Sequence, residues 1–215
     1  MSLFHRSSCL GVLALILAAA TPARANLLTN GSFEVGPALA PGGITPLGPA
    51  DLPGWTLTGA SPWFWYMSAG QYGTAEDGDK FINVTSPSLS QGFAVTAGDT
   101  YTVSYYEALR ADGGNQPDTL QATISLAAGS ASGVTSQLAN NPLTNGVLSN
   151  WELFTFAFTP NTSTTATLAF SLNNGAGYPV LDNVVVTGVP EPGSLVLFGL
   201  GAAGLFMAGC RRRRA

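Results

Sequence analysis

The feature that most constrains the fold is a strict alternation of apolar and polar residues, repeated along the chain. Residues 100–105, 120–126, 154–159 and 165–172 place apolar side chains at every second position, with Thr, Ser, Gln or Ala between them. A period of two residues puts the apolar set on one face of an extended strand. Turn-forming Gly, Asn and Pro separate these segments. The pattern therefore predicts an all-β chain.

We expect these strands to lie in one domain, residues 26–188, which we call the central domain. Its length is enough to bury one core. Residues 27–34 predict a first strand, residues 35–54 predict a Gly- and Pro-rich loop, and residues 128–150 give no clear indication. The expected architecture is a single antiparallel β-sandwich or jelly roll.

Both ends of the chain differ from the central domain. At the start, Arg6, an apolar run and the triplet Ala23-Arg24-Ala25 are typical of a signal peptide covering residues 1–25. We expect signal peptidase to cut after Ala25, so that the mature chain begins at Asn26.

The last segment, residues 189–215, has three parts. The polar motif Val189-Pro190-Glu191-Pro192 is followed by an uncharged apolar run, Gly193 to Cys210, and by four arginines: Arg211, Arg212, Arg213 and Arg214. A helix from Leu195 to Cys210 would rise about 24 Å, a short span for a hydrocarbon core of ~30 Å. The arginines place its C-terminal end in the cytoplasm. The segment therefore predicts a C-terminal transmembrane helix.

This order of motif, apolar run and arginines resembles the PEP-CTERM sorting signal of Gram-negative bacteria. The resemblance implies that a membrane protease-transpeptidase, exosortase, recognises and processes the precursor at the inner membrane. It also implies delivery to the cell surface or to the exopolysaccharide matrix of a biofilm. The alternative is an ordinary C-terminal membrane anchor.

Charge and residue types exclude several functions for the central domain. It has two cations and eleven acidic residues, a net charge of −9, which argues against nucleic acid as a partner. Cys9, Cys210 and His5 are the only Cys and His residues in the chain, and all three lie in the terminal signals. Catalysis by a Ser or Cys nucleophile with His, and Cys/His zinc sites, are therefore excluded. We predict that the protein is not an enzyme; a glycan hydrolase with paired carboxylates is the open alternative.

Four consecutive aromatic residues, Trp63 to Tyr66, are the main candidate for ligand binding. On a strand, Trp63 and Trp65 share one face and Phe64 and Tyr66 the other. Sugar rings stack on exposed aromatic side chains. The candidate glycan contacts are Trp63, Trp65, Tyr66 and Tyr72. The alternative is that both aromatic pairs are buried.

The two ends of the central domain resemble the first and last strands of carbohydrate-binding modules with a galactose-binding-like jelly roll. The resemblance is carried by residues 26–34 and by residues 181–186. It implies glycan binding; the alternative is a purely structural matrix or adhesion protein. It also implies a structural Ca²⁺ held by Glu34 and Asp182, which are otherwise plain strand-end acids. A second acidic stretch, residues 76–79, is interpreted as a solvated turn.

Overall fold

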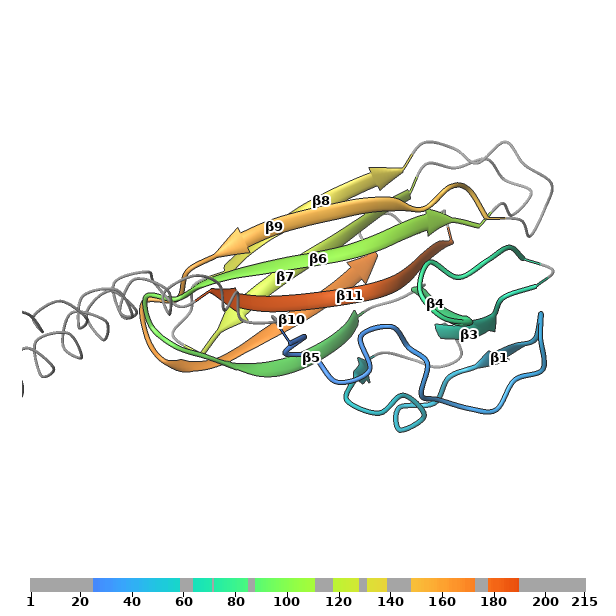
Figure 1. The fold of residues 1–215 in the computed structure, drawn as a ribbon, viewed down its shortest axis with the longest axis horizontal. Coiled ribbons are helices and arrows are strands. Elements are labelled where there is room, and N and C mark those ends of the chain that lie inside the picture. The colour runs from blue at the N-terminus through green and yellow to red at the C-terminus, as the bar shows by residue number, and fades with distance from the viewer. Residues whose placement is uncertain are drawn as a thin grey trace, which may run out of the picture.

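The structure is a computed structural model that describes residues 25–58, 64–70, 72–84, 88–110, 118–127, 131–138, 148–172 and 178–189. This part of the chain forms two sheets packed face to face, with every strand pair antiparallel (Figure 1). The prediction of an all-β antiparallel sandwich is confirmed. The predicted signal peptide up to Arg24 and the predicted span from Gly193 to Cys210 lie outside the described residues. Within them, no helix is long and apolar enough to cross a membrane.

Eleven strands make up the two sheets in the described residues. In spatial order, the six-stranded sheet contains β1 (Ile44–Pro46), β3 (Phe64–Ser68), β4 (Lys80–Val84), β11 (Pro179–Val189), β6 (Thr100–Leu109) and β9 (Glu152–Phe158). The five-stranded sheet contains β2 (Thr56–Thr58), β5 (Ser88–Val95), β10 (Thr164–Leu172), β7 (Asp118–Leu126) and β8 (Ala131–Leu138).

The main core lies between the sheets and is built from the alternating apolar residues. Val103, Tyr105, Leu120 and Leu168 have no solvent exposure. Their strands bury one face and leave the Thr and Ser side chains of the other face partly or fully exposed, as in a half-buried strand. On the edge strand β9, in contrast, Phe154 and Phe156 are only partly buried.

A second, smaller core covers the outer face of the six-stranded sheet. Its fully or nearly buried members are Met67, Phe81, Ala108, Leu148 and Val180. Partly buried side chains, among them those of Tyr72 and Trp151, pack against it. The segment after β3 and the segment before β9 therefore close over this sheet and are fixed by apolar contacts.

The prediction of a first strand at residues 27–34 was wrong. This segment follows β11, because Leu27 N–H donates to Val186 O at 2.9 Å and Val184 N–H donates to the carbonyl of Gly31 at 2.9 Å. It does not form a strand, because Asn30 and Phe33 have left-handed φ angles of 54° and 56°. Left-handed backbone breaks the extended geometry that a β-ladder needs.

Two further elements were not predicted. The short strand β1 lies inside the stretch predicted as a Gly- and Pro-rich loop, and β8 lies inside the stretch that gave no indication. Both are edge strands, each paired on one side only in the described residues. Edge strands bury less apolar surface, so their sequences carry a weaker alternation.

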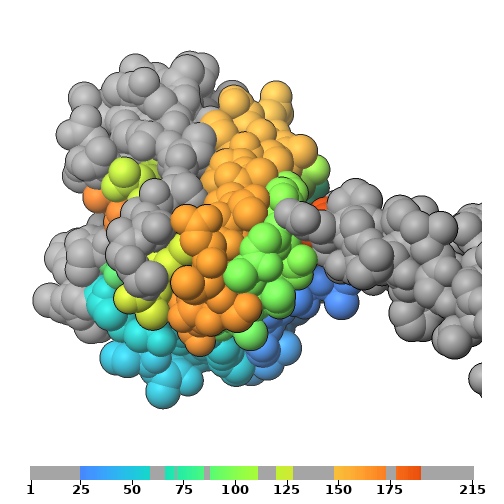
Figure 2. All heavy atoms as spheres, turned by 90° about the vertical axis from the view of Figure 1, so that its left-hand side faces the viewer, coloured from blue at the N-terminus to red at the C-terminus, as the bar shows by residue number. Residues whose placement is uncertain are grey.

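Strand register defines two ends of the sandwich. At one end, which we call the terminal end, Val189 pairs with Thr100, and the turns at 96–99 and 159–163 meet. This end lies on the left in Figure 1 and faces the viewer in Figure 2. At the other end, Pro179 pairs with Leu109, and Arg110 N–H donates to Tyr178 O at 3.1 Å.

Candidate functional site

The end opposite to the terminal end carries a stacked cluster of aromatic and cationic side chains, which we call the aromatic end. The guanidinium carbon of Arg110 lies 5.0 Å from the ring centroid of Tyr178 and 5.9 Å from that of Tyr72. Both distances fall within the range of cation–π attraction. All three side chains are half-buried, so parts of them face solvent.

The position of each member follows from the sheet. Arg110 comes directly after β6 and Tyr178 directly before β11, and these neighbouring antiparallel strands bring the two residues together. Tyr72 is placed by its carbonyl, which accepts a hydrogen bond from Leu148 N–H at 2.9 Å. Segments distant in the chain therefore converge on one side-chain cluster.

Trp151 adjoins the cluster and is fixed in orientation. Its ring meets Phe81 edge-on, with centroids 5.8 Å apart and an interplanar angle of 79°. Its indole N–H donates to the carbonyl of Thr74 at 2.9 Å. A half-buried Trp with an apolar body and a satisfied N–H provides a rigid flat surface.

The aromatic residues predicted from the sequence to contact a glycan occupy different positions in the structure. Tyr72 belongs to the cluster. Tyr66 does not fit the predicted role, because it is fully buried in the main core and its hydroxyl donates to Phe33 O at 2.6 Å. Burial, with the nearby Glu34 carboxylate, raises the pKa of Tyr66 to about 12. Trp63 and the side chain of Trp65 lie outside the described residues.

Asp182 is fully buried on β11. Its carboxylate accepts hydrogen bonds from the first two residues of the acidic turn, residues 76–79. Its Oδ2 accepts hydrogen bonds from Glu76 N–H at 2.8 Å and Asp77 N–H at 3.0 Å. Its Oδ1 accepts from Asn183 N–H at 2.7 Å, and Asn183 Nδ2 donates to Glu76 Oε2 at 2.7 Å. The last strand is thereby tied to a turn more than 100 residues away.

Burial has a clear electrostatic consequence for this carboxyl. Desolvation raises the pKa of Asp182 to about 7, although three backbone N–H groups oppose the shift. The charge of Asp77 adds a smaller upward contribution. The group therefore changes protonation state near neutral pH.

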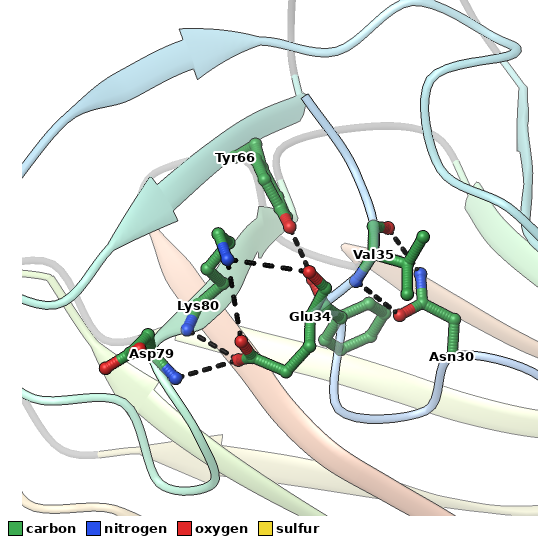
Figure 3. A network of polar contacts seen from close by, with 7 residues as sticks. Asn30, Glu34, Val35, Tyr66, Asp79 and Lys80 are labelled. Atoms are coloured by element: carbon green, nitrogen blue, oxygen red, sulfur yellow. Dashed lines mark hydrogen bonds and ion pairs between the residues drawn. The ribbon is translucent and has the colours of Figure 1, made fainter. Parts of the chain in front are cut away.

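Glu34 holds the other half of the same turn (Figure 3). Its Oε1 accepts hydrogen bonds from Asp79 N–H at 2.8 Å and Lys80 N–H at 2.7 Å, and its Oε2 lies 3.6 Å from Lys80 Nζ. Between them, Gly78 has a φ of 68°, and a Cβ there would lie 2.5 Å from the Glu34 carboxyl carbon. Only glycine combines this backbone conformation with such a close approach.

The two predicted calcium ligands therefore act on one turn, although they do not contact each other. Calcium takes six to eight oxygen ligands. The oxygens of Asp182 and Oε1 of Glu34 already accept backbone N–H groups. No group of three or more His, Cys, Asp or Glu residues arranged to hold a metal occurs in the described part of the chain. The contacts explain both positions without a cation, and calcium binding stays a prediction.

Sequence reasoning missed Arg110, Tyr178 and Trp151. One signal was present, because Arg110 is one of only two cations in the central domain. Its rarity in an acidic domain was the one sequence feature that set Arg110 apart. Nothing in the spacing indicated that Tyr72 and Tyr178 would both lie against it.

Comparison with protein families divides the chain at the end of its last strand. The family model described as protein of unknown function (DUF642) matches residues 26–187. The model described as the PEP-CTERM protein-sorting motif matches residues 188–214. No match was found among curated proteins.

Solved structures with a similar fold include proteins that contact sugars. A carbohydrate-binding module, TmCBM61, in complex with beta-1,4-galactotriose has a TM-score of 0.52 at 17% identity, over 75% of this chain and 97% of that chain. An arabinose-bound α-L-arabinofuranosidase, MgGH51, has a TM-score of 0.51 at 14% identity, over 77% of this chain and 26% of that chain. A family 16 carbohydrate-binding module gives 0.47 at 16% identity, over 75% and 99%. At these identities the likeness concerns the fold alone, a jelly-roll sandwich.

Proposed function

This chain belongs to the DUF642 family, and we propose that its central domain is a glycan-binding module delivered to the cell surface by PEP-CTERM sorting. The observation that carries the proposal is the cluster of Tyr72, Arg110 and Tyr178 at one end of a jelly-roll sandwich. The sorting motif implies a secreted, membrane-anchored precursor. Binding of an exopolysaccharide would retain the processed protein in the matrix around a Gram-negative cell.

The chemistry of the cluster suits a sugar. Aromatic rings offer flat apolar surfaces to the C–H faces of a pyranose, and a guanidinium donates hydrogen bonds to ring hydroxyls or carboxylates. Trp151 packs against the same small core as Tyr72, and its indole N–H donates to the carbonyl of Thr74. The half-exposed state of all four side chains leaves part of each one accessible.

A glycan array with the purified protein tests this function. We expect retention of at least one polysaccharide, and loss of that retention in Tyr178→Ala and in Tyr72→Ala. The matched control is Tyr106→Ala, because Tyr106 is also a half-buried tyrosine of the six-stranded sheet but lies on β6, paired with Leu153 and Asp182. If both cluster variants retain the polysaccharide as well as the wild type does, the cluster is not the glycan-binding site.

The competing function is a purely structural matrix protein. It differs from the proposal in one measurable respect, because a structural protein shows no glycan retention in the array and still reaches the surface. A hydrolase is the third possibility, and turnover of glycoside substrates by the purified protein would establish it.

Processing is the other half of the proposal. An exosortase-type enzyme is the expected partner at Val189 to Pro192, after signal peptidase has acted at the first end. Calcium at Glu34 and Asp182 is proposed as a stabilising ion, supported by the acidic residues gathered at the turn 76–79. Its test is a thermal melt, described below.

A further inference from the structure

We propose that the terminal end of the sandwich lies against the lipid headgroups of the membrane that holds the precursor, so that the aromatic end faces away from the bilayer. The proposal rests on the proposed function only in taking the PEP-CTERM segment as the membrane tether. It defines an interaction surface, residues 96–100, 159–163 and 187–189, with a lipid surface as partner.

The first observation is that the sheet continues almost to the start of the tether. β11 stays in register with β6 up to its last residue, Val189, which pairs with Thr100. Gly188 packs against Tyr101 so closely that a Cβ at Gly188 would lie 2.8 Å from a ring carbon of Tyr101. The sorting-motif match begins at residue 188. The motif therefore starts inside the sheet.

The second observation is the length of chain between the sheet and the apolar run. Only Pro190, Glu191 and Pro192 separate Val189 from Gly193. The extended chain from Val189 to Gly193 covers four Cα-to-Cα steps, roughly 14 Å at most. The headgroup layer on one side of a bilayer is about 5–8 Å thick. If the apolar run enters the hydrocarbon at Gly193, the end of β11 is held within roughly 10 Å of the membrane surface.

The third observation is that this end is a rigid surface. The turns before β6 and after β9 are joined by Gly98 N–H to Pro160 O at 3.0 Å and Ala97 N–H to Ser163 Oγ at 3.0 Å. Thr96 N–H also donates to the Tyr101 hydroxyl at 2.8 Å. Figure 2 shows the two turns side by side, in green and orange.

The N-terminal segment reinforces the same region. Asn26, where the family match begins, donates from Nδ2 to Val184 O at 2.8 Å and accepts at Oδ1 from Val186 N–H at 3.0 Å. From Gly31 to Asn26 the chain runs along β11 toward the terminal end. Asn26, where the family match begins, and Gly188, where the sorting-motif match begins, thus both lie at the C-terminal part of β11.

Charge makes a lipid surface a suitable partner. Asp99 is the acidic residue of the described turns at this end, which otherwise carry Thr, Ser, Asn, Ala, Gly and Pro. Hydroxyl and amide groups form hydrogen bonds with headgroups, and a nearly uncharged surface avoids repulsion by anionic lipids. The acidic turn at 76–79 is held by Glu34 and Asp182, away from the terminal end.

The consequence for function concerns orientation. β11 has eleven residues, from Pro179 at the aromatic end to Val189 at the terminal end, and Tyr178 directly precedes it. At ~3.3 Å per residue the strand is roughly 35 Å long. A domain seated on its terminal end therefore presents Tyr72, Arg110 and Tyr178 to the polysaccharide outside the membrane while it is still tethered.

The test uses the full-length protein in lipid vesicles, with Cys9 and Cys210 replaced by Ala and one new cysteine carrying a fluorophore. Ala97→Cys and Asn161→Cys report on the terminal end, and Thr74→Cys is the matched control at the aromatic end; all three residues are exposed. The vesicles contain a lipid with a quencher on its headgroup. We expect loss of most of the emission from Ala97→Cys and Asn161→Cys, and background quenching of Thr74→Cys.

Each outcome decides the proposal. Equal quenching at both ends overturns it. Quenching of Ala97→Cys only after an exosortase-type enzyme is added to the vesicles also overturns it, because the surface would then bind protein. Release of the protein from vesicles by alkaline carbonate would show that no span holds it, and the docking proposal falls with the tether. Glycan retention through Tyr72 and Tyr178 is measured separately, so its failure is distinguishable from all of these.

Discussion

The two ends of the sandwich are stabilised by different chemistry. At the terminal end, backbone groups and hydroxyls bond to one another across the turns 96–99 and 159–163. At the aromatic end, a guanidinium stacks on tyrosine rings, and buried Asp182 holds an acidic turn. Short-range hydrogen bonds between neutral groups fix a shape. Half-exposed rings and a cation also leave surfaces that a ligand can contact, so the comparison separates a scaffold from the proposed binding site.

The largest effect we expect is on sorting. Replacing Glu191 by Ala, or deleting Arg211 to Arg214, should abolish processing and surface delivery, because the motif and the orienting charges are then lost. The melting temperature should not change, since these residues follow the last strand. Fractionation of cells, with an immunoblot for the precursor, gives the measurement. Normal processing of the Glu191 variant would contradict the role of the motif.

The second prediction concerns pH and the aromatic end. Because burial raises the pKa of Asp182 from 3.8 to about 7, the folded state holds its proton more tightly than the unfolded state. The free energy of unfolding should therefore fall as pH rises from about 4 to about 7, by up to roughly 4 kcal/mol for this group alone.

Asp182→Asn removes this titration, so its stability should decline less over the same range. Urea unfolding at several pH values between 4 and 7 measures both curves. Parallel curves for the wild type and the variant would show that Asp182 is not a source of the pH dependence.

The third prediction probes the N-terminal segment beside the terminal end. Asn26→Ala leaves the carbonyl of Val184 and the N–H groups of Val186 and Leu28 without their side-chain partner. An unsatisfied group costs about 1–3 kcal/mol, less where water replaces the partner. We expect a loss of about 1–3 kcal/mol in urea unfolding. Asn161→Ala is the control, because Asn161 is exposed in a turn of the same end. Equal stability of the two variants would rule out a stabilising role for the Asn26 side chain.

The fourth prediction separates charge from stacking at the aromatic end. Arg110→Lys keeps the positive charge and loses the planar group that lies against two rings. The expected cost in stability is about 0.5–1 kcal/mol per exposed cation–π contact, whereas glycan retention should fall more strongly. Matched thermal melts and array measurements on this variant test the pair of effects. A large loss of stability with full retention would make the stack purely structural.

The smallest expected effect is that of calcium. If Glu34 and Asp182 bind Ca²⁺ only in the folded state, the melting temperature rises with added Ca²⁺ and falls with a chelator. The rise should be small, because the oxygens that would bind it already accept N–H groups. Identical melts in both conditions would remove the calcium proposal.

The strands were predictable because the signal that forms them is local. Alternation at 100–105 or 165–172 fixes which side chains share a face, and burial of Val103, Tyr105 and Leu168 follows directly. The segment at 27–34 was not predictable in the same way, because its left-handed residues break a pattern that looks extended. Edge strands such as β1 were not predicted, because they bury less apolar surface and their sequences alternate less clearly.

The candidate site was predicted only in part. Tyr72 was identified because aromatic residues are concentrated nearby, but Tyr66 from the same stretch faces the core, where its hydroxyl meets Phe33. Glu34 and Asp182 were identified through the ends of the domain. Their partners, the backbone N–H groups of one turn, carry no sequence signature.

By itself the sequence determined the strand faces, the acidic and cysteine-free character of the domain, and the sorting motif, because each depends on residues close together in the chain. Tertiary structure alone decided what meets across long separations. Asp182 bonds to a turn 106 residues away, Asn26 bonds to Val186 across 160 residues, and Arg110 lies against two tyrosine rings from other segments. Strand register sets these encounters, and register is fixed by the packing of the whole sandwich.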